Sequence, residues 1–220
     1  MEARRRRPLP WLNPGIFVGA MAPAVTILVR ARSGALGANP IAEALNELGL
    51  IALVLLIASL ACTPLKTLLG WTWPMRARRL IGLLAFTYAA LHLTVYAGLD
   101  QGLDFRAVLA DVVKRRFIFV GFAAFVMMIP LASTSTGAAV RRMGYVKWRQ
   151  LHLLVYPAAL CAVIHFVWRV KKDLREPLVY AAVLAVLLLG RIVFRSRTAA
   201  RPPEPARRAS SPPGGSPSRP

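Results

Sequence analysis

Long apolar segments dominate the pattern of hydrophobic and polar positions in this chain. None of them alternates with a period of two, which excludes a membrane β-barrel, and most approach the roughly 20 residues that a helix needs to cross the hydrocarbon core. Because lipid offers no partners to backbone groups, such segments must be helices. The pattern predicts an all-α, polytopic membrane protein with six transmembrane helices at approximately 12–29, 48–63, 80–98, 117–133, 151–168 and 177–194.

Composition supports this class and suggests three regions. Hydrophobic residues make up 56% of the 220 residues and the mean hydropathy is +0.52, against about 45 to 50% apolar residues in soluble domains. We expect an Arg-rich arm over 1–10, a helical domain over 11–195, and a Pro/Ser/Arg-rich tail over 196–220 that is disordered. The first apolar segment lacks a clear small-residue cleavage site after Val29, so it should be retained rather than removed as a signal peptide.

Positive charge is distributed unevenly between the two sides of the predicted bundle. Of the 29 Lys and Arg residues, 19 fall in the arm, the tail and the loops on the same side. Since cytoplasmic segments carry the Lys and Arg excess, both termini should face the cytoplasm. A net charge of +20 would suggest nucleic acid in a soluble protein, but here topology and contact with anionic membrane lipid account for it, and we expect no nucleic-acid partner.

All three histidines of the chain, His92, His152 and His165, lie within apolar segments. A single intramembrane histidine can serve simply as a hydrogen-bonding group between helices. Three of them, with none elsewhere, favour a cofactor, and haem iron is the most economical partner. Cys62 and Cys161 belong to no CxxCH haem-attachment pattern, so any haem would be held non-covalently, as haem b.

Depth along the helices indicates which histidines can share an iron. The third and fifth segments both run outward from the cytoplasm, which places His92 and His165 at comparable depth in the outer half, as a candidate bis-histidine site. His152 lies about 20 Å deeper, and it points about 140° away from His165 on an ideal helix. His152 and His165 can both face cofactors only if the fifth helix is central, tilted or bent. The alternative is that His92 pairs with His152, and that His165 supports the site without binding iron.

The sequence disfavours transport and substrate catalysis. The six predicted segments contain no Asp or Glu to relay protons and no broken-helix inverted repeat, and the sequence shows no nucleotide-binding glycine pattern or Ser-His-Asp arrangement. Electron transfer is therefore the expected role. Whether the chain is itself an enzyme stays open.

Seven motifs, by their order and spacing, resemble the MsrQ/YedZ family, the haem-binding membrane subunits of bacterial periplasmic methionine sulfoxide reductase systems. The motifs are GALGANPIAEALNELG, CTPL, RRLIGLLAFTYAALHLTVY, STSTG, WRQLHLLVY, IHFVWRVK and PLVYA, within residues 9–195. The resemblance implies a ferric-reductase-like bundle in the bacterial inner membrane, with b-type haem and FMN. It also implies electrons from the quinone pool or a cytoplasmic flavin reductase, and the periplasmic molybdopterin subunit MsrP as the partner that reduces methionine sulfoxide.

The family's functional histidines correspond by motif to His92, His152 and His165, the expected haem ligands. For the FMN site we consider Arg78 and Arg79, together with the STSTG element at Ser133–Gly137. The arginines have a simpler explanation in positive-inside topology, and the hydroxyls in helix termination. Two other functions stay open. One is a stand-alone ferric or cupric reductase, which should carry a cytoplasmic FAD and NAD(P)H domain not seen in this sequence. The other is a cofactor-free scaffold or transporter.

Overall fold

The computed structural model describes residues 10–170 and 173–199, with side chains to Val193. The expected arm and tail lie outside this range except at their inner edges. Within the described residues, six helical crossings are long and apolar enough to span a membrane, and no strand occurs, which confirms the all-α, six-helix prediction. The crossings are α1 (Leu12–Arg32), α2 (Pro40–Leu69), α3 (Trp73–Val95) with a π-helical turn (Tyr96–Asp100), α5 (Arg116–Ser133), α7 (Tyr145–Leu151) with α8 (Val155–Arg169), and α9 (Arg175–Ala199).

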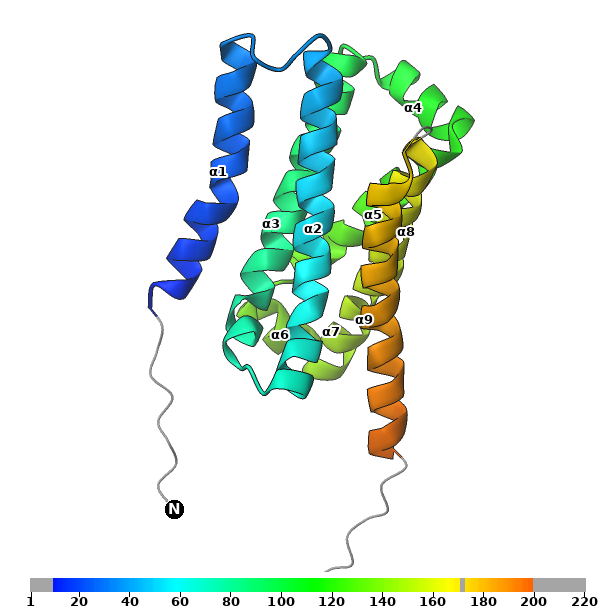
Figure 1. The fold of residues 1–220 in the computed structure, drawn as a ribbon. Helices are drawn as coiled ribbons and strands as arrows, with labels where there is room; N and C mark the ends of the chain where they lie inside the picture. Colours follow the sequence, from blue (N-terminus) through cyan, green and yellow to red (C-terminus); the bar gives the residue numbers. More distant parts are fainter. Residues whose placement is uncertain (1–9, 171–172, 200–220) are drawn as a thin grey trace, which may run out of the picture.

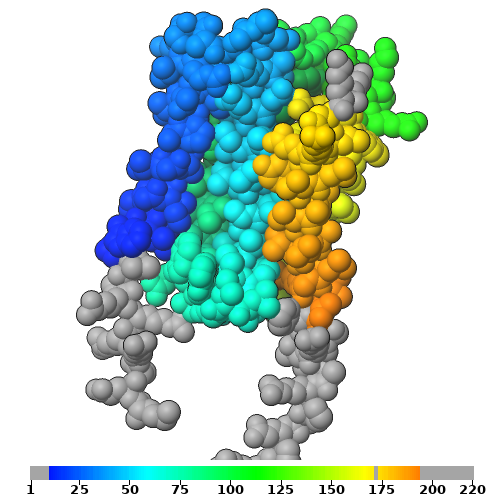
Figure 2. All heavy atoms as spheres, in the orientation of Figure 1, coloured from blue at the N-terminus to red at the C-terminus, as the bar shows by residue number. Residues whose placement is uncertain are grey.

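Helix α2 is the central element of the bundle. It packs against α3 along most of its length and also contacts α1, α8 and α9, while α5 packs chiefly against α8. Figure 1 shows the start of α1 and the end of α9 at the same end of the bundle, as six crossings require. We call this the terminal end and the opposite one the far end. In Figure 2 the surface of α2 is visible between α1 and α9.

The core lies between α2, α3, α5, α8 and α9, and it combines large aliphatic side chains with small residues. Ala158 and Ala159 on α8 are fully buried, because small residues allow membrane helices to approach closely. The other buried members are Leu53, Leu56, Ile57, Leu60, Ala85, Met128, Val155, Val163 and Leu184.

Helix α1 bends where a tyrosine from α3 enters its hydrogen-bond ladder (Figure 1). The fully buried Tyr88 donates its hydroxyl to the Ala20 carbonyl and accepts from the Ala24 N–H at 3.1 Å. Pro23 stands beside this insertion. A proline and an inserted side chain are both recognised causes of helix bending, so Tyr88 fixes the bend and ties α1 to α3.

Helix α2 begins eight residues before the apolar segment that predicted it. Asn39 caps its first turn by accepting from the Ala42 N–H at 3.1 Å. Glu43 and Glu47 therefore belong to helix α2, although both precede the apolar segment 48–63. Arg30 of α1 pairs with both carboxylates, at 2.5 Å for Glu47, so the acids are neutralised where α1 and α2 meet.

The fifth crossing is broken by a 3₁₀ turn over His152–Leu154, between α7 and α8. A 3₁₀ turn rotates about 120° per residue and an α-helix about 100°. Three such residues reduce the expected angle between His152 and His165 from about 140° to about 80°. This local change of helix type lets one crossing present two histidines toward the interior.

Two short helices were not predicted. Helix α4 (Phe105–Lys114) follows the π-helical turn and is capped by Asp104, whose carboxylate accepts from the Arg106 and Ala107 N–H groups at 2.8 and 3.1 Å. Helix α6 (Gly137–Met143) is capped by Thr136. Both are too short to register as apolar segments, and α4 covers part of the far end (Figure 1).

Candidate cofactor site

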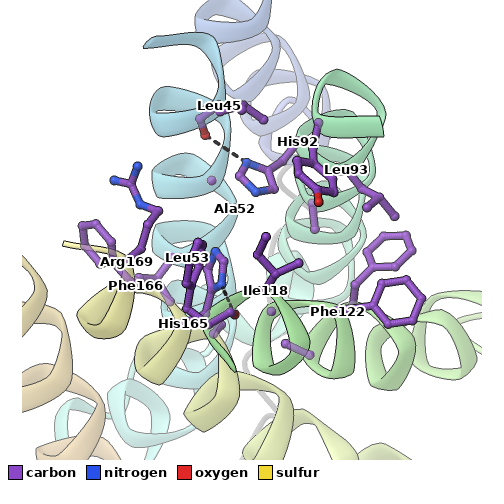
Figure 3. A pocket seen from close by; sticks show the side chains of 18 of the residues that line it. Leu45, Ala52, Leu53, His92, Leu93, Ile118, Phe122, His165, Phe166 and Arg169 are labelled. Atoms are coloured by element: carbon purple, nitrogen blue, oxygen red, sulfur yellow. Dashed lines mark hydrogen bonds between the residues drawn. The ribbon is translucent and has the colours of Figure 1, made fainter. Parts of the chain in front are cut away.

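His92 on α3 and His165 on α8 face one cavity of about 350 Å³. Their ring centroids are 6.3 Å apart and the ring planes are nearly perpendicular, at 84°. Figure 3 shows the two rings approaching from different helices, with apolar side chains around them. The structure thus brings together the two histidines placed at comparable depth. His152, the other candidate partner of His92, lines a different cavity.

Each histidine of the pair is held through Nδ1 by a helix carbonyl (Figure 3). His92 Nδ1 lies 2.9 Å from the Leu45 carbonyl oxygen, and His165 Nδ1 lies 2.6 Å from that of Phe117. A carbonyl only accepts hydrogen bonds, so a neutral ring must carry its hydrogen on Nδ1 and keep a lone pair on Nε2. Metal-binding histidines are oriented in this way. Both rings are therefore prepared to bind a metal through Nε2.

Glycines make room for both rings. A Cβ atom on Gly121 of α5 would lie 2.5 Å from His165 Nδ1, and one on Gly49 of α2 would lie 3.1 Å from His92 Nδ1. Each glycine follows the accepting carbonyl by four residues, so the same local arrangement occurs on two helices. Sequence reasoning missed both. The available signal was an isolated glycine inside an apolar helix, which often has a packing or functional reason.

The pair suits a metal that brings its own equatorial ligands. Within residues 10–170 and 173–199, no cluster of three or more His, Cys, Asp or Glu side chains is placed to hold a bare metal ion. With ring centroids 6.3 Å apart, the two imidazoles leave room for one metal ion between them, since imidazole nitrogens bind metals at about 2 Å. The lining of the cavity is mostly apolar, as a porphyrin requires. These residues fit a haem.

His152 lines a second, larger cavity of about 1010 Å³ near the terminal end, which we call the arginine pocket. Its Nδ1 lies 3.0 Å from the Trp148 carbonyl oxygen, and its Nε2 is buried without a hydrogen-bond partner among the described residues. The predicted site residues Arg78 and Arg79 line the same cavity, and its described lining contains no Asp or Glu. Its arginines are Arg78, Arg79, Arg149 and Arg191. This pocket favours an anionic occupant.

Comparison with known proteins now decides the family. Residues 48–163 match the family described as "Ferric reductase like transmembrane component". Three relatives named "Protein-methionine-sulfoxide reductase heme-binding subunit MsrQ" align over most of the chain. The one from Rhodospirillum rubrum is 49% identical, over 86% of this chain and 91% of the relative. Those from Deinococcus radiodurans and Azospira oryzae are 46% and 43% identical, over 93% and 87% of this chain and 99% and 82% of the relatives. The chain belongs to the MsrQ family.

This MsrQ-family chain is thus a multi-pass membrane protein with a ferric-reductase-like transmembrane fold. The matched residues 48–163 include His92 and His152 and end two positions before His165. No solved structure gives a significant match. The pairing of His92 with His165 therefore comes from the geometry of this chain.

The STSTG element of this MsrQ-family chain ends helix α5. The hydroxyls of Thr134 and Ser135 donate to the carbonyls of Pro130 and Leu131 at 2.5 and 2.7 Å, and the Thr136 hydroxyl accepts from the Ala139 N–H at 3.1 Å. These contacts match the helix-termination role. Ser135 and Thr136 also line the arginine pocket, so the element shapes that cavity while its hydroxyls bond to the backbone.

The two cavities share some of their lining side chains. Leu56 and Met128, both buried, line both of them. Phe86 lines the arginine pocket and Phe125 the cavity of the histidine pair, and their rings stack with centroids 5.5 Å apart and planes 12° apart. The MsrQ fold here places two candidate cofactor sites in series along the bundle.

Proposed function

We propose that this chain is the electron-transfer subunit of a bacterial methionine sulfoxide reductase system, and that it carries haem b between His92 and His165. The observation that carries the proposal is the histidine pair, in which both rings face one cavity and have their Nδ1 atoms held by carbonyls. The MsrQ relatives are named as heme-binding subunits of a reductase, which supports the same role.

A haem held by both His92 and His165 would favour electron transfer over oxygen binding. A bound haem supplies one-electron iron chemistry. His92 and His165 hold and orient it, and the apolar lining keeps water away. Neither cysteine belongs to a CxxCH haem-attachment pattern. The haem would therefore be retained only by the two histidines and by non-covalent contacts with the cavity lining.

We assign the arginine pocket to a second, anionic cofactor. His152 offers a buried, unpartnered Nε2 as a ligand to a second haem, and Arg78 and Arg79 suit either haem propionates or the phosphate of FMN. The FMN assignment derives from family resemblance. Its electrons would come from the quinone pool or from a cytoplasmic flavin reductase.

The distribution of Lys and Arg residues indicates how the bundle is oriented in the membrane. With both termini on the cytoplasmic side of the inner membrane, the arginine pocket faces the electron donor and the histidine pair lies in the periplasmic half. The far end then meets the periplasmic molybdopterin subunit MsrP, where methionine sulfoxide would be reduced. The chain itself needs no substrate site.

The experiment is a dithionite-reduced minus oxidised visible spectrum of purified, haem-supplied protein. We expect b-type bands in the wild type, and their loss or marked reduction in His92→Ala and His165→Ala. His152→Ala should leave the bands of the histidine-pair haem in place. Thr94→Ala, on an exposed part of α3, controls for changes to that helix. A folded wild type without these bands would contradict the proposal.

A further inference from the structure

Arg169 places a positive charge at the far-end edge of the cavity that holds the histidine pair. It follows His165 by four residues on α8, so the two side chains project from the same helix face. Arg169 is half-buried, donates to the Asn46 side-chain oxygen and lies 5.9 Å from the centre of the Phe166 ring. Figure 3 shows it beside Phe166 at the cavity edge. Among the described residues, no carboxylate lies within 4 Å of its guanidinium.

Arg115 lines the same cavity but is already paired. Its Nε lies 3.2 Å from Asp111 Oδ1, and Asp111 Oδ2 accepts from the Tyr96 hydroxyl at 3.2 Å. Tyr96 follows His92 by four residues, as Arg169 follows His165. Each histidine therefore has a polar side chain one helical turn beyond it. Tyr96, beyond His92, belongs to a network with its own carboxylate, whereas no carboxylate of the described residues lies within 4 Å of the guanidinium beyond His165.

A guanidinium has five N–H donors, and Asn46 uses one of the donors of Arg169. The remaining donors have the planar arrangement that matches a carboxylate. The interior part of the cavity, by contrast, is lined by Ala52, Leu53, Ala124 and Met128. A ligand with an apolar body and carboxylate arms would therefore direct those arms toward Arg169.

We infer that Arg169 binds a carboxylate of the group held between His92 and His165. This inference rests on the proposed function, in which that group is a haem with two propionates. Asn46 positions the guanidinium, and Arg169 selects the carboxylate form of the porphyrin and fixes which edge points to the far end. It is an anion subsite within the haem site, and it is distinct from the arginine pocket at the terminal end.

The test compares haem with haem dimethyl ester, in which both carboxylates are blocked. Full-length apoprotein in detergent is titrated with each porphyrin and binding is followed by the Soret band. We expect the wild type to prefer haem by about 10- to 100-fold, the range for a hydrogen bond with a charged partner. Arg169→Gln should reduce this preference to within about twofold. Arg115→Gln, the matched control at the same cavity, should keep it.

An unchanged preference in Arg169→Gln, or an equal loss in Arg115→Gln, would overturn the inference. If Arg169→Gln fails to fold, the same titration with haem and haem dimethyl ester is made with Arg169→Lys. This variant keeps the charge without the planar donor pair, so an intermediate preference supports the inference and an unaltered one contradicts it. A wild type that binds both porphyrins equally, with histidine-dependent spectra, refutes only the Arg169 subsite. A wild type that binds neither refutes the proposed function.

Discussion

The chemistry of each intramembrane histidine is set by one backbone carbonyl. In His92, His152 and His165 alike, Nδ1 lies within 3.0 Å of a carbonyl oxygen. This contact fixes the tautomer and leaves Nε2 as the available ligand atom. Their position within apolar segments was enough to predict the three histidines as candidate cofactor ligands. The carbonyl partners could not be predicted, because two of them lie on neighbouring helices and depend on the packing.

Gly121 and Gly49, which make room for the two histidine rings, predict different losses of haem when each is replaced by alanine. Gly121→Ala should lower haem content strongly, because the new Cβ would lie 2.5 Å from His165 Nδ1, whereas Gly49→Ala, at 3.1 Å from His92 Nδ1, should lower it less. Gly190→Ala on α9 meets nothing within 4 Å and should stabilise its helix by up to about 1 kcal/mol. Haem per protein and thermal midpoint are measured for all three. Equal haem content in Gly121→Ala and Gly190→Ala would contradict the seating role.

At the scale of the element, apolar segment length predicted the crossings well and their internal shape poorly. The six segments were found because about 20 apolar residues are required to cross lipid. The 3₁₀ turn over His152–Leu154 left no mark in that pattern. Neither did the bend in α1, since it depends on a tyrosine far along the chain.

Tyr88→Phe tests the link between α1 and α3. Removing the hydroxyl leaves the Ala24 N–H and the Ala20 carbonyl without this partner, which should destabilise the protein by about 1 to 3 kcal/mol. Haem content should be little changed, since Tyr88 does not line the cavity of the histidine pair. Thermal unfolding in detergent measures the effect, with the exposed Tyr145→Phe as control. A midpoint equal to that of the control would show that the hydroxyl does not hold the bend.

At the scale of the whole molecule, the two cavities lie in series and share Leu56 and Met128 as a wall. Depth arguments from the sequence placed His152 apart from the other two histidines, and in the structure it lines a separate cavity together with Arg78 and Arg79. The volumes of the cavities and the Phe86–Phe125 stack between them could not be predicted, because they result from the packing of several helices at once.

The series arrangement predicts that electrons cross the membrane through the chain. Sealed vesicles containing the haem-loaded, full-length protein and trapped dithionite, with a membrane-impermeant ferric acceptor outside, measure this crossing directly. The wild type and Thr94→Ala should reduce the external acceptor, whereas His165→Ala and His152→Ala should each slow the reduction at least tenfold, because each interrupts one of the two sites. A wild type no faster than protein-free vesicles, or a His165→Ala variant as fast as the wild type, would contradict the account.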